Sequence, residues 1–177
     1  MSHATIAGMT QSGKTFAGIE LAKGFRAAGV GTLVLHKPLE PWPAAAASWQ
    51  TDDIERFLPM FDRARGCAVF MELSDAAVSK YDARVHRCFT AGRHLGHRVH
   101  YMTQRPATVH PAIRENCVAL YLFNCAANAA AVWAEEFNDP ALLRASTLPP
   151  FVFLHKPSRF APAVLRKFVL PNGRDQR

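Results

Sequence analysis

The chain has 177 residues, of which 49% are hydrophobic and 20% are charged, and its formal net charge is +7. This composition suits one globular domain and excludes an intrinsically disordered chain, while the positive charge favours a polyanionic partner such as nucleic acid. No apolar run approaches the ~20 residues of a membrane-spanning helix, so we expect no integral membrane segment. We expect one domain over residues 1–170 and a flexible polar tail over 171–177.

Short apolar runs alternate with longer helical stretches along the chain. We expect strands over residues 4–7, 32–36, 67–71, 98–103, 118–123 and 151–155. We expect helices over residues 14–28, 52–65, 75–95 and 126–137, and a short helix over 44–47 after a proline-rich loop. This alternation predicts an α/β fold in which a mostly parallel sheet is covered by helices on both faces.

The segment between the first strand and the first helix reads GMTQSGKT and matches the pattern G-x-x-x-x-G-K-[ST]. Its glycines let backbone N–H groups curl round a phosphate, and the helix that starts at Lys14 points its positive end at the same anion. In such a loop Lys14 reaches the β- and γ-phosphates and Thr15 offers its hydroxyl to Mg²⁺. We therefore expect ATP and Mg²⁺ as ligands. The expected nucleotide-binding residues are Gly8, Met9, Thr10, Gln11, Ser12, Gly13, Lys14, Thr15 and Phe16.

Two further polar side chains follow expected strands. The segment AVFMELSD over residues 68–75 places Glu72 at the end of the third strand, and Gln104 follows the strand that ends at Thr103. The carboxyl ends of parallel strands line the ligand crevice of an open sheet. A Gln at that edge can orient a water molecule against the γ-phosphate, because its amide both donates and accepts hydrogen bonds.

Several motifs together resemble the FtsK–HerA superfamily of DNA-pumping ATPases. Besides the phosphate loop and the acidic strand end, Arg87 and Arg93 precede Gly96 and an apolar strand. The sequence TQRP follows at 103–106, and Ile-Arg-x-Asn follows at 113–116. The resemblance covers roughly residues 4–123. With its short length, the chain is most similar to the genome-packaging ATPases of tailless, membrane-containing DNA viruses.

The resemblance implies a RecA-like ASCE sheet and a homo-oligomeric ring, typically a hexamer, with active sites shared between subunits. In such a ring Gln104 is the polar sensor, and Arg93 or Arg87 is the arginine finger that acts on the neighbour's site. The implied activity is ATP hydrolysis coupled to translocation of double-stranded DNA into a preformed capsid. The implied partners are capsid or membrane vertex proteins, in the host cytoplasm or the virion.

The family pattern also gives roles to the end of the third strand. There an Asp-Glu pair supports Mg²⁺ and polarises the attacking water. Met71 stands in place of the Asp, and Glu72 keeps the catalytic position. We expect Glu72, together with Thr15, also to contribute to the metal site.

Two other functions fit parts of the sequence. A small P-loop kinase shares the phosphate loop, and a non-hydrolysing nucleotide-binding assembly protein tolerates the loss of the Asp at Met71. DNA-stimulated ATP hydrolysis separates the motor from both. The histidines at 94, 97 and 100 are spaced like metal ligands, but a predicted break at Gly96 scatters them, so we expect them at a basic surface or interface.

Overall fold

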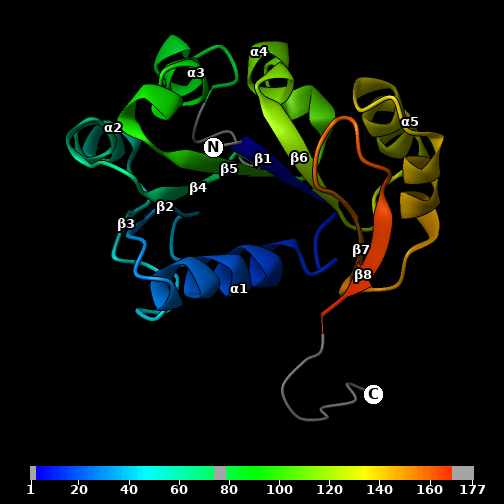
Figure 1. Ribbon diagram of the computed structural model, residues 1–177, viewed down its shortest axis with the longest axis horizontal. Helices are drawn as coiled ribbons and strands as arrows, with labels where there is room; N and C mark the ends of the chain where they lie inside the picture. Colours follow the sequence, from blue (N-terminus) through cyan, green and yellow to red (C-terminus); the bar gives the residue numbers. More distant parts are fainter. Residues whose placement is uncertain (1–2, 74–78, 169–177) are drawn as a thin grey trace.

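The computed structural model describes residues 3–73 and 79–168. Within this part of the chain, one sheet has the strand order β3-β2-β4-β5-β1-β6-β7-β8 (Figure 1). The strands are β1 His3–Ala7, β2 Thr32–Leu35, β3 Trp49–Thr51, β4 Ala68–Glu72, β5 Arg98–Thr103, β6 Cys117–Leu122, β7 Val152–Lys156 and β8 Val164–Lys167.

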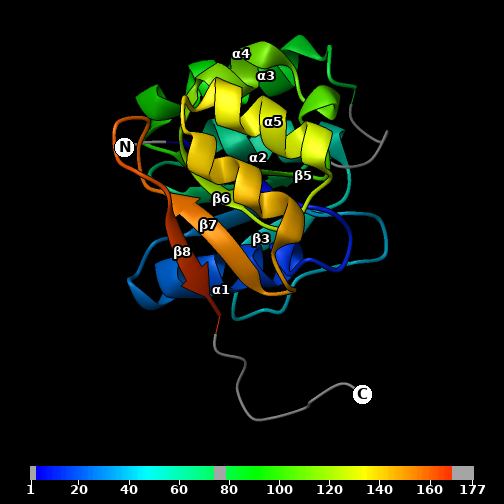
Figure 2. The same cartoon turned by 90° about the vertical axis from the view of Figure 1, so that its right-hand side faces the viewer.

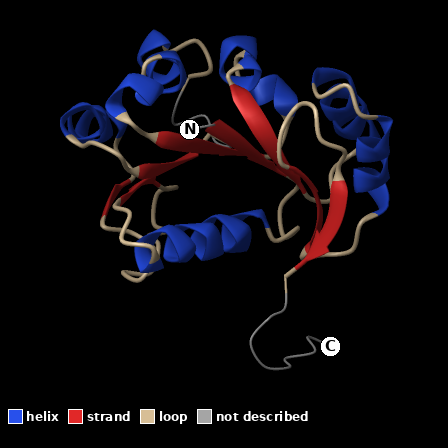
Figure 3. Ribbon diagram, in the orientation of Figure 1, coloured by secondary structure: helices blue, strands red, loops and turns tan. Residues whose placement is uncertain are grey.

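Helices cover both faces of this sheet. Figure 3 shows α1 alone beneath the sheet and the other helices above it. The α-helices are α1 Lys14–Ala27, α2 Ile54–Arg63, α3 Ala83–Thr90, α4 Pro111–Glu115 and α5 Ala127–Glu136. Three 3₁₀ segments are η1 Gly92–Leu95, η2 Pro106–Thr108 and η3 Pro140–Thr147. Figure 2 shows α5 and β7 on the same side of the molecule. The expected α/β fold is confirmed.

The strand pairing determines which loops meet at the carboxyl edge. The six strands from β3 to β6 in this order run parallel to one another, whereas β7 pairs antiparallel with both β6 and β8. Because β5 lies between β1 and β4, the segment after β5 stands between the loop after β1 and the acidic end of β4. This order brings the three polar segments identified in the sequence to one edge.

The hydrophobic core has two layers, one on each face of the sheet. Along β4, Val69 and Met71 pack on the side of α2 and α3, while Ala68 and Phe70 pack on the side of α1. Successive side chains of a strand point to opposite faces, so this alternation also determines which side chain at the end of β4 is directed towards α1.

The prediction of one long helix over 75–95 is wrong for residues 79–95. Residues 74–78 lie outside the described part of the chain. Helix α3 begins only at Ala83, because the Asp82 side chain caps it by accepting a hydrogen bond from the Arg84 N–H at 2.9 Å. It ends at Thr90 and is followed by η1, whose first residue Gly92 packs closely against Phe61 and Val99. Arg87 and Arg93 therefore lie on two different elements.

Other differences concern short or exposed elements. Residues 44–46 form a turn rather than a helix. The strands Trp49–Thr51 and Val164–Lys167 were not expected, because the first has three residues and the second is exposed along its whole length. Neither carries the alternation of buried and exposed side chains that reveals a strand in a sequence. Residues 171–177 lie outside the described part of the chain.

None of the helices in the described ranges 3–73 and 79–168 has the length and apolar character needed to cross a membrane.

Candidate nucleotide-binding site

Backbone hydrogen bonds from neighbouring strands hold the loop between β1 and α1. The Gly8 N–H donates to the Thr103 carbonyl at 3.1 Å, and the Met9 N–H donates to the Asn124 carbonyl at 2.8 Å. Thr103 ends β5, and Asn124 follows β6. The loop is therefore anchored to both strands that flank β1.

The loop forms a cradle that only glycine permits at two positions. A Cβ atom on Gly8 would lie 2.6 Å from the Phe123 Cβ and 2.6 Å from the Ser12 Oγ. Gly13 has a φ of 104°, in the left-handed region that favours glycine. The Ser12 hydroxyl is buried and has no hydrogen-bond partner within the described residues, as expected of a group that awaits a ligand.

The start of α1 is suited to an anion. Gly13 is its N-cap, no side chain caps the helix, and its first turn carries no acidic residue that would compete with a phosphate. Lys14 is only 4% exposed, and Thr15 beside it is half-buried. The buried ammonium, the orphaned Ser12 hydroxyl and the glycine cradle fit the phosphates of a nucleotide.

The pleat of β4 separates Met71 from Glu72. Met71 is fully buried and packs with Leu35 and Tyr101 on the face away from α1. Glu72 shares a face with Phe70, which packs on the α1 side, and is half-buried. The acidic side chain on the same face as α1 is therefore Glu72, and Met71 is a core residue.

Gln104 lies between Glu72 and the loop along the edge of the sheet. The hydroxyls of Thr103 and Thr108 lie 2.9 Å apart and both contact the Arg105 carbonyl, which holds the turn after β5 closed. Gln104 is half-buried at this turn. Since the Thr103 carbonyl also binds the Gly8 N–H, the turn and the phosphate loop are directly connected.

A cleft of about 670 Å³ opens beside these elements. Its walls come from the phosphate loop, the turn after β5 and the first turns of α5. The lining residues are Met9, Thr10, Gln104, Arg105, Pro106, Ala107, Ala126, Asn128, Ala129 and Val132. Among the described residues that line the cleft, Arg105 alone has an ionisable side chain, and it is exposed.

The candidate arginine finger Arg93 lies near the opposite edge of the sheet, and Arg87 is paired on the surface of α3. Gly92, beside Arg93, packs near His3 at the amino end of β1, whereas the phosphate loop follows its carboxyl end. Burial and the Arg93 charge lower the pKa of His3 to about 4. Arg87 donates to the Asp62 carboxylate at 2.6 Å, which raises the pKa of Arg87. Arg93 is exposed.

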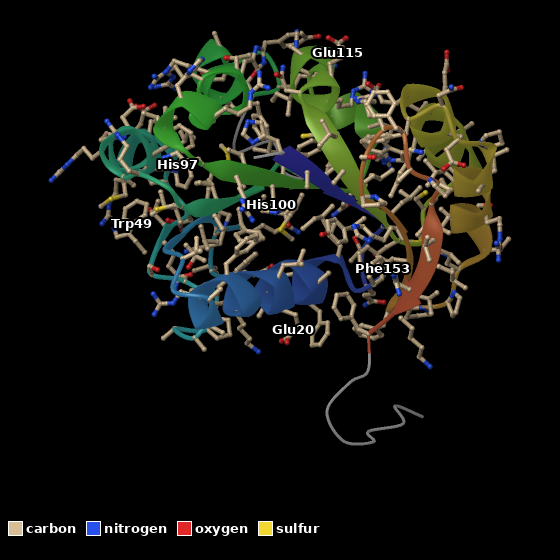
Figure 4. All side chains as sticks on the ribbon, in the orientation of Figure 1. Glu20, Trp49, His97, His100, Glu115 and Phe153 are labelled. Carbon is tan, nitrogen blue, oxygen red and sulfur yellow. The ribbon has the colours of Figure 1, made fainter. Side chains whose placement is uncertain are left out.

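The expectation that the three spaced histidines lie at a basic surface or interface is wrong for His97 and His100, which are buried in the core. Figure 4 shows His97 on the α2 side of the sheet and His100 on the α1 side. His97 bonds the Phe61 carbonyl and the Cys67 N–H, and His100 stacks on Phe70 at 4.6 Å. Burial lowers the pKa of both rings, that of His100 to about 4. Both are uncharged core residues at neutral pH.

Sequence reasoning missed two residues that contact the phosphate loop. Asn124 presents its carbonyl to Met9, and its side-chain amide donates to the Leu148 carbonyl at 2.5 Å. A polar residue directly after an apolar run was the available signal for Asn124. Phe151 donates its N–H to the Ser12 carbonyl at 2.9 Å, and nothing in its sequence context indicates this.

No protein-family model and no curated protein sequence matches the chain. Among solved structures, it is similar to the genome packaging NTPase B204 from Sulfolobus turreted icosahedral virus 2 in complex with sulfate. The TM-score is 0.79 at 14% identity, over 97% of this chain and 98% of that one. The chain shares the fold of this packaging NTPase.

The same fold extends to larger proteins. The pCW3 conjugation coupling protein TcpA matches with a TM-score of 0.69 at 16% identity, over 94% of this chain and 59% of that chain. The cytoplasmic domain of the type VII secretion ATPase EccC of Thermomonospora curvata matches with a TM-score of 0.61 at 16% identity, over 93% of this chain and 25% of that chain. At the level of fold, these neighbours agree with the resemblance to FtsK–HerA ATPases.

Proposed function

We propose that the chain is an ATPase that packages viral DNA by translocating it into a preformed capsid. The observation that carries the proposal is the phosphate cradle at the end of β1, with Glu72 and Gln104 beside it on the same edge. Structures with this fold include a viral genome packaging NTPase solved with the ATP analogue AMPPCP.

The residues at this edge divide the chemistry of ATP hydrolysis between them. The loop N–H groups and Lys14 would hold the phosphates. Thr15 with Glu72 would hold Mg²⁺, which would supply positive charge against the phosphates. Glu72 also polarises the attacking water, and Gln104 orients it. The place of Glu72 on the α1 face of β4 supports this proposed role.

A ring in which neighbouring subunits share each site explains the position of the arginines. Arg93 lies near the amino ends of the strands, so it serves a phosphate loop only in another subunit. Arg93 is the better candidate of the two, because Arg87 is paired with Asp62. A hexamer is the ring size that the family resemblance implies.

Double-stranded DNA is the proposed polyanionic partner. The formal net charge is +7, and besides Arg93 three exposed arginines stand close to the amino ends of β4 and β5. They are Arg63, Arg65 and Arg98. Arginines of this kind bind phosphates without reading bases. The remaining proposed partners are capsid or membrane vertex proteins, in the host cytoplasm or the virion.

Displacement of a triplex-forming oligonucleotide from duplex DNA tests translocation. The wild-type protein is expected to displace the oligonucleotide with ATP but not with AMPPCP, and Lys14→Ala is expected to be inactive with either. A wild-type protein that hydrolyses ATP yet leaves the triplex intact at every protein concentration contradicts translocation.

A further inference from the structure

Phe151, directly before β7, has a backbone conformation that an aromatic residue rarely adopts. Its φ is 61°, in the left-handed region, where a Cβ atom crowds the following carbonyl oxygen. Such strain persists only where the surrounding structure enforces it, and it is concentrated at functional sites. The contacts of Phe151 therefore indicate what the strain serves.

Phe151 contacts two consecutive residues of the phosphate loop. Its N–H donates to the Ser12 carbonyl at 2.9 Å. A Cβ atom on Gly13 would lie 2.9 Å from the Phe151 Cδ1 and 3.2 Å from its Cα, so ring and backbone pack directly against Gly13. Phe151 therefore supports the loop from one side with both a hydrogen bond and a packing contact.

This support determines the direction of a phosphate-binding N–H group. The Ser12 carbonyl and the Gly13 N–H belong to one planar trans peptide and point in opposite directions. Once the carbonyl is bound to Phe151, the Gly13 N–H is directed away from Phe151, to the opposite side of the loop. The ring packed against Gly13 limits rotation of this peptide plane about the hydrogen bond, so loss of the ring is expected to leave the N–H without a fixed direction.

Phe151 is held in turn by the hairpin of β7 and β8. Its carbonyl accepts a hydrogen bond from the Phe168 N–H at 3.1 Å. Its ring meets Phe16 of α1 edge-to-face at 5.7 Å, and Phe16 meets Phe168 in the same way at 5.5 Å. The hairpin and the first turn of α1 thus enclose Phe151 from both sides.

We propose that Phe151 is a positioning residue that holds the Ser12–Gly13 peptide in its nucleotide-binding orientation before the nucleotide arrives. The inference rests on the proposed binding of ATP by the phosphate loop and assigns Phe151 a part in it. It also makes the β7–β8 hairpin a part of the nucleotide site rather than only an edge of the sheet.

Phe151→Gly tests the proposal, because glycine keeps the N–H and the left-handed backbone but removes the ring. A fluorescent ATP analogue is expected to bind this variant about tenfold more weakly, since the competent loop conformation becomes a minor population. Hydrogen exchange of the loop amides, measured without nucleotide, is expected to become faster. Phe151→Tyr, which keeps the ring, is expected to bind the analogue and to exchange its loop amides as the wild-type protein does.

Phe153→Leu is the matched control. Phe153 stacks on Phe123 at 4.9 Å in the same aromatic cluster, and Figure 4 shows it on β7. This variant is expected to lower Tm while affinity and loop exchange stay at their wild-type values. If Phe153→Leu and Phe151→Gly lower Tm equally and also lose affinity equally, Phe151 contributes only to stability and does not position the loop.

Two other outcomes are decisive. Wild-type affinity and wild-type loop exchange in Phe151→Gly overturn the inference alone. A wild-type protein that does not bind the analogue overturns the proposed function, and the exchange measurement still decides whether Phe151 orders the loop. Should Phe151→Gly fail to fold, Phe151→Asn replaces it, because Asn tolerates the left-handed region.

Discussion

At the scale of single residues, the pleat of β4 determines which side chain at its end faces α1. The family pattern places Met71 where an Asp supports the metal, but Met71 is fully buried in the core layer on the far side of the sheet from α1. Glu72 follows Phe70 on the α1 face. A comparison of motif positions does not reveal this, because it ignores the direction in which each side chain points.

Met71→Asp is accordingly expected to damage the core rather than to improve the metal site. It places a carboxylate among apolar side chains, and we expect a loss of about 3 kcal/mol or more in the free energy of unfolding. Urea denaturation measures this loss. Met71→Leu is the volume-conserving control, and its free energy of unfolding is expected to fall by less than about 1.5 kcal/mol. Unchanged stability together with tighter Mg²⁺ binding in Met71→Asp would contradict the placement of Met71.

His100 makes the stability depend on pH. Burial lowers its pKa from 6.5 to about 4, so between these values the unfolded chain binds a proton that the folded chain does not. The stability from His100 is present above pH 6.5 and is lost as the pH falls towards 4, by about 3 kcal/mol in total. Burial lowers the pKa of His3 to about 4 as well, and His3 therefore acts in the same direction.

Urea denaturation at pH 7.5 and pH 5.0 tests the contribution of His100. The wild-type protein is expected to be less stable at pH 5.0, and His100→Phe, which keeps a ring stacked on Phe70, is expected to show a smaller difference. His94→Gln, at an exposed position, serves as the control and should behave as wild type. An identical pH dependence of His100→Phe and wild type rules out His100 as a source.

At the scale of elements, the parts that the sequence predicts are those with buried faces. The apolar strands β1, β4 and β5 and the helix α1 were expected within a few residues of their observed bounds. The exposed strand β8 was not expected. It pairs with β7 in antiparallel register, and Arg159 in the loop that joins the two strands ties this loop to neighbouring elements. Arg159 donates to the carbonyls of Cys117 at 3.2 Å, Glu136 at 2.6 Å and Arg114 at 3.0 Å.

Arg159→Lys is expected to loosen the hairpin, because an ammonium group does not reach three carbonyls in the fixed geometry of a guanidinium. Loss of two of these hydrogen bonds is expected to cost about 2 kcal/mol in the free energy of unfolding. Urea denaturation measures the effect, and Arg166→Lys on the exposed strand β8 should stay within about 0.5 kcal/mol of wild type. Equal stabilities of the two variants would show that Arg159 does not hold the hairpin.

At the scale of the whole molecule, the strand order explains why the site could be predicted in part. Gly8, Glu72 and Gln104 each follow an apolar run, and the carboxyl ends of parallel strands meet at one edge, so their proximity was foreseeable. The break between Arg87 and Arg93 lies where α3 ends and Gly92 packs against Phe61 and Val99, and this packing has no clear sequence signal. Phe151 reaches the loop only through tertiary folding.

The separation of Arg93 from the phosphate loop of the same chain predicts complementation between subunits. Arg93→Ala alone is expected to slow DNA-stimulated ATP hydrolysis about 1000-fold, as for other arginine fingers. Mixed rings of Arg93→Ala and Lys14→Ala subunits are expected to recover up to about one quarter of wild-type turnover, because random mixing creates that share of intact shared sites. Verified mixed rings without any recovery would exclude Arg93 as the finger.

The most direct test of the proposed function is ATP hydrolysis with and without double-stranded DNA, measured for the wild-type protein, Lys14→Ala and Glu72→Gln. We expect DNA to stimulate the wild-type protein and Lys14→Ala to be inactive. We expect Glu72→Gln to hydrolyse ATP at least about 100-fold more slowly than the wild-type protein. The proposed ATPase activity would be contradicted if the wild-type protein released no phosphate at any DNA concentration. The proposed role of Glu72 would be contradicted if Glu72→Gln had wild-type turnover.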